Sequence, residues 1–182
     1  MSRYNVFETT NLGATHYAER IFDAICSSDV ENGTFGYLNG LATGYTHVYN
    51  FVPGTSEGAF IVVANNPAWT DDNARMTSQR RDKYIIPAGT PFRVFVIKKN
   101  DEFATAIEGV TTASQTNMAV DAYVTIDSST GKLVASASAP TGSPAFVGKV
   151  MRERIVGGTL ATAAHNYGYA TKLFTVKVET LA

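Results

Sequence analysis

With 182 residues, 45% of them hydrophobic, the chain is long enough for one domain, or one domain with an arm, around a real core. Its 15 basic and 16 acidic residues nearly cancel, which argues against a nucleic-acid coat because such a protein needs a basic field. Only 17% of the residues are charged, a composition that suits a surface held against other proteins.

The single cysteine and the N-terminal residues argue against several further classes of protein. Cys26 excludes an internal disulfide framework and a cysteine-based zinc site, and its position after Ile25 predicts a small core residue. The opening MSRYNVFETTNLG lacks the apolar core of a secretory signal, and no apolar run is long enough to cross a bilayer. We therefore expect a protein made in the cytoplasm without a Sec-type signal, and no membrane partner.

The first residues predict an extended arm. Residues 1–16 mix single aromatic side chains with polar ones and lack the periodicity of a segment that folds alone. The arm carries four apolar side chains, Tyr4, Val6, Phe7 and Leu12. Exposed apolar groups on such a segment favour burial by a partner. We expect residues 17–182 to form the folded domain.

Strand-like segments follow in chain order. Residues 16–28, HYAERIFDAICSS, are compatible with a short helix, but we favour a strand. Period-two alternation between turn signals then recurs in GTFGYL, HVYNFV, GAFIVVA, PFRVFVI, EFATAIEG, AVDAYVTID, KLVASASA, AFVGKVMRERIVGG and KLFTVKVET. Eight or nine strands at this spacing predict an all-β fold: a single β-sandwich or barrel domain, tulip-like, with an extended N-terminal arm.

Two hairpins have recognisable turns. PFRVFVI and EFATAIEG flank a charged tip at residues 98–101, and we expect Val94, Val96 and Phe103 to fill the core. AVDAYVTID returns through SSTG into KLVASASA, where Gly131 supplies the positive φ that a short loop needs. The inward-facing positions of this second hairpin are Val120, Ala122, Val124, Ile126, Leu133, Ala135 and Ala137.

Two stretches interrupt the strands. Residues 65–82 are polar and longer than an ordinary connection, and such loops are often functional. Residues 159–169, TLATAAHNYGY, have room for one short helical turn.

No motif predicts catalysis, a cofactor or a metal. STGK at 129–132 resembles the end of a phosphate loop, but Ile126 stands where that loop needs glycine and Leu133 where it needs serine or threonine. The three histidines are far apart in sequence, and no carboxylate recurs beside them at a ligand-like spacing. They are His16, His47 and His165. The acidic pairs Asp71–Asp72 and Asp29/Glu31 are typical of solvated positions, with a cation site at the first pair as the sharper alternative.

One basic cluster lies in the long polar loop. It consists of Arg75, Arg80, Arg81 and Lys83. A solvated loop beside its neighbouring aspartates is the simplest interpretation, and docking on an acidic protein surface is the alternative. Trp69 lies near, but one aromatic residue does not make a stacking platform for nucleic acid.

The order of these segments resembles the capsid decoration, or cement, proteins of tailed bacteriophages, over residues 30–155. The matching positions are Pro87-Ala88-Gly89, Arg93, Asp101-Glu102-Phe103, Gly131-Lys132-Leu133 and Phe146-Val147-Gly148. These motifs are structural turns. Where the family pattern has glycine before the acidic tip residue, this chain has Asn100, which also accepts a positive φ.

The resemblance implies a structural protein without catalysis. Such proteins bind the outer surface of the phage head, commonly as oligomers at symmetry axes, and stiffen the expanded capsid. The implied partners are the major capsid protein and further copies of the chain, with a homotrimer favoured over a dimer. The arm would then add a strand to a neighbouring sheet, and several arms per oligomer would give avidity.

Two other classes stay open. One is a different virion component, such as a tail-tube, head-fibre or baseplate module. The other is a carbohydrate-binding β-sandwich, for which Tyr45, Tyr49, Tyr167 and Tyr169 could supply a ring of exposed aromatics.

Overall fold

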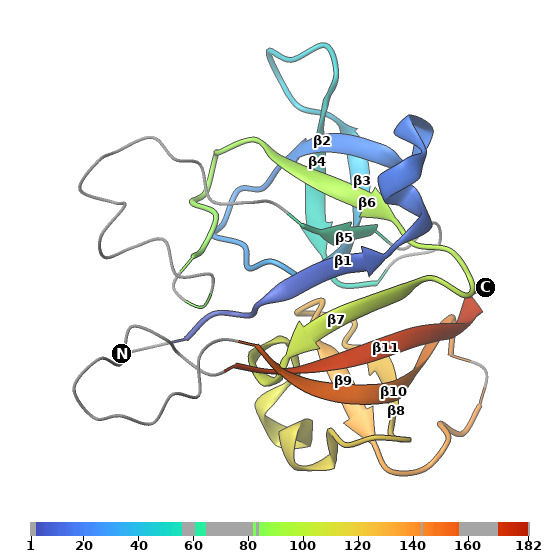
Figure 1. Ribbon diagram of the computed structural model, residues 1–182. Helices are drawn as coiled ribbons and strands as arrows, with labels where there is room; N and C mark the ends of the chain where they lie inside the picture. The colour runs from blue at the N-terminus through green and yellow to red at the C-terminus, as the bar shows by residue number, and fades with distance from the viewer. Residues whose placement is uncertain are drawn as a thin grey trace.

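The computed structural model describes residues 3–55, 61–64, 82, 84–142, 144–156 and 171–181. Within those ranges the chain forms a closed β-barrel stacked on a six-stranded sheet (Figure 1). The expected all-β fold is therefore confirmed.

The barrel is built from strands that lie between residues 21 and 96. Its members are β2 (Ile21–Ile25), β3 (Phe35–Leu41), β4 (Val48–Pro53), β5 (Ile61–Val63) and β6 (Phe92–Val96), closed in the order β2-β4-β3-β5-β6. Strands β2 and β4 run parallel, and every other pairing in the barrel is antiparallel. Alternating side chains point inward to a core that includes Cys26, the small core residue expected from the sequence.

The sheet is built mainly from the second half of the chain. Its members are β1 (Phe7–Asn11), β7 (Glu102–Ala106), β8 (Tyr123–Ile126), β9 (Leu133–Ser136), β10 (Phe146–Val156) and β11 (Thr171–Leu181), in the order β1-β7-β11-β10-β8-β9. All of its pairings are antiparallel. Short 3-10 turns occupy the connections: η1 (Gly13–His16), η2 (Ala18–Arg20), η4 (Ile107–Gly109) and η5 (Thr112–Asn117).

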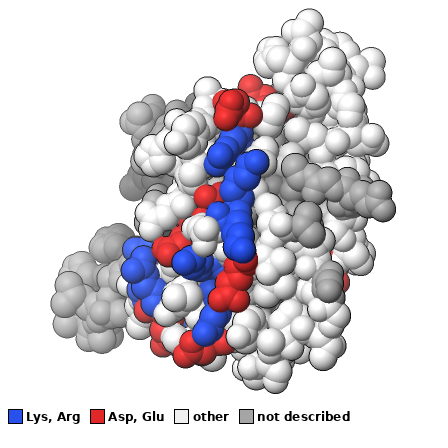
Figure 2. Space-filling model, turned by 90° about the vertical axis from the view of Figure 1, so that its right-hand side faces the viewer, with Lys and Arg blue, Asp and Glu red and all other residues white. Residues whose placement is uncertain are grey.

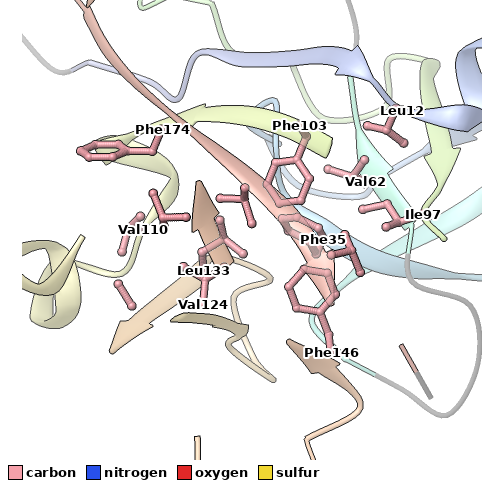
Figure 3. Packing of buried hydrophobic residues seen from close by; sticks show 14 of the residues in the cluster. Leu12, Phe35, Val62, Ile97, Phe103, Val110, Val124, Leu133, Phe146 and Phe174 are labelled. Carbon is pink, nitrogen blue, oxygen red and sulfur yellow. The ribbon is translucent and has the colours of Figure 1, made fainter. Parts of the chain in front are cut away.

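One hydrophobic core joins the barrel to the sheet. Phe35 of the barrel packs against two phenylalanines of the sheet, with its ring centroid 5.6 Å from those of both Phe103 and Phe146 (Figure 3). Phe7 stacks on Phe103 at 5.3 Å and extends the aromatic row to the N-terminal strand. Because these side chains belong to one packed cluster, the two β-structures cannot separate without exposing it to water.

The segment around the charged tip is not a hairpin. β6 pairs with β2 and β5 in the barrel, whereas β7 pairs with β1 and β11 in the sheet. The tip at residues 98–101 is therefore the crossover between the two β-structures. Asp101, which is buried, accepts hydrogen bonds from the backbone N–H groups of Lys98 and Gly13 at 2.8 and 3.1 Å and fixes the direction of this crossover.

The N-terminal residues are extended, but they do not form a free arm. Phe7 lies opposite Thr105 in the β1–β7 pairing, so the segment is an integral strand of the sheet. Val6 is 4% exposed and Leu12 is fully buried, which makes the expectation of exposed apolar anchors wrong for these two residues. The sequence pattern misled because a short strand takes its stability from its neighbours rather than from its own periodicity.

Other local expectations are confirmed. The segment at 16–28 contains strand β2, and β8 and β9 form the expected hairpin with Gly131 at φ +68°. Two flanking positions of that hairpin, Val120 and Ala137, are exposed instead of facing inward. The interrupting stretches at 65–82 and 159–169 lie outside the described residues, apart from Asp82.

Candidate functional site

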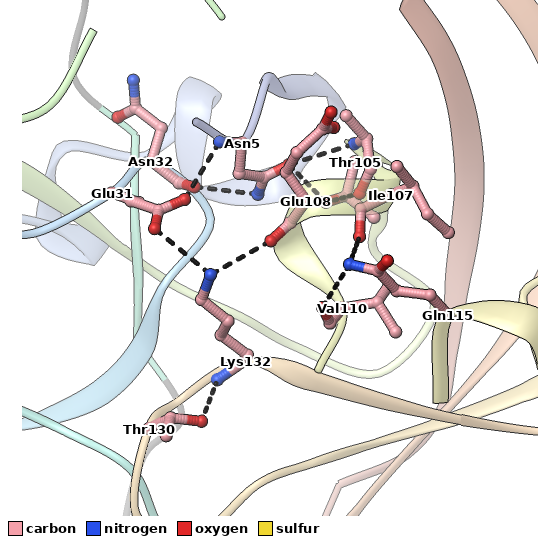
Figure 4. Close-up of polar contacts among 11 residues, drawn as sticks. Asn5, Glu31, Asn32, Thr105, Ile107, Glu108, Val110, Gln115, Thr130 and Lys132 are labelled. Atoms are coloured by element: carbon pink, nitrogen blue, oxygen red, sulfur yellow. Dashed lines mark hydrogen bonds and ion pairs between the residues drawn. The ribbon is translucent and has the colours of Figure 1, made fainter. Parts of the chain in front are cut away.

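A buried polar network connects the N-terminal segment to both β-structures (Figure 4). Its centre is Asn5, which is 1% exposed. The side-chain Oδ1 of Asn5 accepts hydrogen bonds from Thr105 Oγ1 at 3.0 Å and from the Ala106 N–H at 3.1 Å. Its Nδ2 donates to the Asn32 carbonyl at 2.8 Å, and its backbone N–H donates to Glu31 Oε2 at 3.0 Å. The amide is thus satisfied on both sides, as a buried polar group must be.

An ion pair continues the network into the β8–β9 turn. Lys132 Nζ lies 3.2 Å from Glu31 Oε1 and donates to the Glu108 carbonyl at 3.1 Å. Glu31 therefore accepts a hydrogen bond from Lys132 with Oε1 and one from the Asn5 backbone N–H with Oε2. The lysine of the STGK sequence is thus held by Glu31 and by the Glu108 carbonyl, and its side chain is partly exposed.

Two glycines make room for Asn5. A Cβ on Gly33 would lie 2.3 Å from Asn5 Nδ2, and a Cβ on Gly109 would lie 2.4 Å from the same atom. Real Cβ atoms do not approach so closely, so both positions need glycine for the amide to fit. The network contains an amide, a hydroxyl and a paired lysine and glutamate. These groups suit it to holding the N-terminal segment, β7 and the β8–β9 turn in fixed positions relative to one another.

The turn between β8 and β9 docks on the barrel through main-chain hydrogen bonds. The Phe35 N–H donates to the Gly131 carbonyl at 2.9 Å, and the Thr55 N–H donates to the Ser128 carbonyl at 3.3 Å. Within the turn, Asp127 Oδ1 accepts from the N–H and hydroxyl groups of both Ser129 and Thr130. These bonds, first of all that from the Thr130 hydroxyl, lower the pKa of Asp127 to about 2.

The described residues contain no assembled metal centre. No group of three His, Cys, Asp or Glu side chains lies together in a way that could hold an ion, within the ranges that the structure describes. His16 and His47 are both exposed, on different elements, and His165 lies outside the described residues. None of the helices in the described part of the chain is long and apolar enough to cross a membrane.

The strongest candidate for a contact surface is the outer half of the β3–β4 hairpin. The sequence contains no Lys, Arg, Asp or Glu between Glu31 and Glu57, and this uncharged stretch includes both strands and the loop that joins them. Leu41 is 53% exposed and Tyr45 is 42% exposed at the end of the hairpin. The loop, drawn in cyan, projects from the barrel at the top of Figure 1. We call residues 39–50 the hairpin tip.

The backbone of the hairpin tip is held in place. The Ala42 N–H donates to the Val48 carbonyl at 2.8 Å, and the Tyr45 N–H donates to the Ala42 carbonyl at 3.1 Å. Asn50 Nδ2 donates to the Leu41 carbonyl at 3.2 Å. The exposed apolar groups are therefore presented from an ordered turn, which lowers the entropy cost of binding.

Charged residues are concentrated elsewhere. On the face that Figure 2 shows, Lys, Arg, Asp and Glu gather in a band, with uncharged surface beside it. The signs alternate within the band. Ion pairs of the sheet are of this mixed kind, such as Lys149 with Asp121 at 3.0 Å and Arg154 with Glu8. The hydrogen bond and charge of Asp121 raise the pKa of the Lys149 amine.

The structure separates the site residues expected from the sequence. Val6 belongs to a small cluster with Ala104, Ala106 and Leu173, and Leu12 belongs to the shared core. Tyr4 and Phe7 are partly exposed, and the Tyr4 N–H donates to the Asp82 carbonyl at 2.8 Å. The remaining expected residues lie outside the described ranges: Trp69, Arg75, Arg80 and Arg81, together with Lys83 and the pair Asp71–Asp72.

The aromatics considered for carbohydrate binding do not all share one surface role. Tyr45 is exposed on the hairpin tip, whereas Tyr49 packs edge-on against Phe22 with centroids 5.7 Å apart. Tyr167 and Tyr169 lie outside the described residues.

Sequence reasoning missed the hairpin tip. The signal that could have found it is the interval without charge between Glu31 and Glu57, which is longer than any other uncharged interval of the sequence. A comparison with known proteins found no matching family model, no matching curated protein and no matching solved structure.

Proposed function

We propose that this chain is a structural protein of a bacteriophage head, which binds the outer surface of the mature capsid and stabilises it without catalysis. The observation that carries the proposal is the exposed, ordered and uncharged hairpin tip with Leu41 and Tyr45. Apolar and aromatic groups on a preorganised turn are typical anchors of protein–protein contacts.

The body behind the tip has the properties that a brace needs. A closed barrel and a sheet share one core, and main-chain hydrogen bonds from Phe35 and Thr55 tie the β8–β9 turn to the barrel. A load applied at the hairpin tip is therefore passed to a packed body rather than to a linker.

The residues that carry the family resemblance support the fold of this brace. Gly131 and Asp101 occupy the turn that joins the β-structures and the crossover between them, and Phe146 fills the shared core. These three residues take part in the packing of the body, so they support the architecture, and in this proposal the hairpin tip supplies the docking surface. The loop residues Trp69, Arg75, Arg80 and Arg81 remain a second candidate contact.

A homotrimer, with a dimer as the second choice, is part of the proposal because closed symmetry matches the local axes of an icosahedral shell. Light scattering at micromolar concentration is expected to report three subunits. A monomer in solution, together with single copies on the capsid, would remove this part of the proposal.

The capsid role is tested by cosedimentation with expanded capsids of the source phage that lack the protein. We expect saturable binding and a capsid that resists heating better when decorated. Leu41→Asp and Tyr45→Asp are each expected to weaken binding at least about tenfold, because each places a charge in an apolar contact. Tyr17→Asp is the matched control, since Tyr17 is 54% exposed on a different element.

Other results point to the other classes. No saturable binding to capsids contradicts the proposal. Cryo-electron microscopy density at the tail, the baseplate or a head fibre would assign the chain to another virion component. Saturable binding on a glycan array, abolished by Tyr45→Asp, would assign it to the carbohydrate-binding class.

A further inference from the structure

Strand β10 extends beyond its neighbour on one side. It pairs with β11 from Phe146 to Val156, but its pairing with β8 includes only Gly148 and Lys149, extended by the hydrogen bonds of Val150. A β-bulge between Val150 and Arg152 lies at the point where the pairing with β8 stops. We call residues 151–156 the β10 overhang. Along it, no described strand occupies the edge opposite β11.

The overhang is exposed on both faces. Every residue from Met151 to Ile155 is exposed, and the two apolar ends are prominent, with Met151 49% and Ile155 59% exposed. An edge strand directs the N–H and C=O groups of alternate residues to its open side, where another strand can pair with them.

The ends of the sheet, by contrast, are covered. The outer edge of β9 is blocked by η5 and its neighbours: the Thr111 N–H donates to the Leu133 carbonyl, Ala135 N–H donates to Ser114 Oγ, and Asn117 Nδ2 donates to the Ala135 carbonyl. β1 lies between β7 and the barrel (Figure 1). The barrel itself is closed. The overhang is thus open where these other edges are covered.

A second copy of the chain fits this edge poorly. Two-fold antiparallel pairing places one residue opposite its own copy, and the central residues of the overhang are Arg152, Glu153 and Arg154. A two-fold axis at any of these three residues places like charges directly opposite each other, which destabilises a strand pair. Pairing of the overhang with the same segment of a second copy is therefore unfavourable.

The charges indicate what does fit. Arg152 donates from Nε to the neutral Thr175 hydroxyl at 3.3 Å and has no carboxylate partner among the described residues. Glu153 and Lys172 form an exposed pair at 2.9 Å, which contributes little and can be shared with an incoming group. Arg154 is paired with Glu8, and its side chain is 44% exposed, so this pair can be shared in the same way. Opposite this strand, acidic residues complement the two arginines, a basic residue complements Glu153, and an apolar residue covers Ile155.

We propose that the β10 overhang binds an extended segment of another protein by strand addition. The segment carries the alternating pattern apolar, acidic, basic, acidic, apolar. Main-chain hydrogen bonds to the open edge supply affinity, and the cross-strand charges supply selection. The inference does not depend on the capsid role, because it concerns a different surface and any partner strand of this chemistry.

The test uses the full-length protein and a fluorescent peptide, TVEKEVT, titrated by anisotropy to about 1 mM. The peptide pattern reads the same in both directions, so it fits parallel and antiparallel pairing. We expect saturable binding of TVEKEVT and at least about tenfold weaker binding of the charge-swapped peptide TVKEKVT. Methylation of the alternate backbone nitrogens of the peptide that face the β10 edge should abolish binding, because it removes the donors of the strand pairing.

Variants locate the binding on the overhang. Ile155→Lys is expected to weaken TVEKEVT binding at least about tenfold, and Arg152→Glu is expected to reverse the preference between the two peptides. Tyr17→Lys is the control, because it adds the same charge at a 54% exposed aromatic position outside both proposed contact surfaces. Circular dichroism of each variant checks that the fold is intact.

Three results would overturn the proposal: no saturable binding of TVEKEVT, equal binding of the charge-swapped peptide, or unchanged binding by the Ile155→Lys and Arg152→Glu variants. Since these measurements contain no capsids, their failure leaves the proposed function untouched. If the protein fails to bind capsids, the proposed strand-addition site is still tested independently by the peptide measurements.

Discussion

The backbone of Phe35 contacts Gly131 in a way that leaves no room for a side chain. The Phe35 N–H donates to the Gly131 carbonyl at 2.9 Å, and a Cβ on Gly131 would lie 2.0 Å from the Phe35 carbonyl oxygen. Gly131 also has φ +68°. This contact between barrel and sheet therefore needs glycine at position 131 for both its conformation and its close approach.

Gly131→Ala is expected to lower the free energy of unfolding by more than about 3 kcal/mol, because left-handed strain adds to a main-chain collision. Gly89→Ala is the matched control. Gly89 has φ +75° and nothing within 4 Å of its would-be Cβ, so it tests the strain alone, at about 1–2 kcal/mol. Equal losses in urea unfolding would show that the close approach contributes nothing.

Asn5→Ala is expected to cost about 2–4 kcal/mol of unfolding free energy, because it removes three hydrogen bonds of a buried amide, those with the Thr105 hydroxyl, the Ala106 N–H and the Asn32 carbonyl. Asn11→Ala, which removes an exposed hydrogen bond to Glu102, should cost less than about 0.5 kcal/mol. Chemical denaturation of both variants makes the comparison. A small effect at Asn5 would mean that water replaces the amide.

Leu12→Ala is expected to cost about 2–5 kcal/mol, since Leu12 is fully buried in the shared core. Leu41→Ala, the same substitution at a 53% exposed position, should leave the melting temperature nearly unchanged. Deletion of residues 2–12 should abolish cooperative unfolding, because it removes β1 along with Leu12. A truncated protein that melts like the full chain would restore the view of these residues as a separable arm.

Acid is expected to weaken the β8–β9 turn through Asp127. Its pKa in the folded protein is about 2, below the ordinary 3.8, so the charged form is favoured by folding. The stabilisation is present above about pH 4 and is lost as the pH falls toward 2. Because the carboxylate is partly exposed, we expect roughly 1 kcal/mol.

The control for this prediction is Asp127→Asn, which cannot ionise. The difference in unfolding free energy between the wild type and Asp127→Asn should shrink between pH 5 and pH 2. A constant difference across that range would show that the stabilisation of the turn does not depend on the carboxylate charge.

The sequence by itself determined the local elements. Period-two alternation located the strands, including the uncertain one that became Ile21–Ile25, and SSTG with Gly131 defined the β8–β9 hairpin. These features depend on residues close together in the chain, where backbone preferences and turn geometry act directly.

Only the tertiary structure decided which strands are neighbours. PFRVFVI and EFATAIEG look like the two halves of a hairpin, yet β6 closes the barrel and β7 joins the sheet, because each buries its apolar face against strands distant in sequence. The same holds for Phe7 and Leu12, whose burial depends on β7 and the shared core. Strand pairing is a long-range choice made by packing, and a local pattern records only that a strand exists.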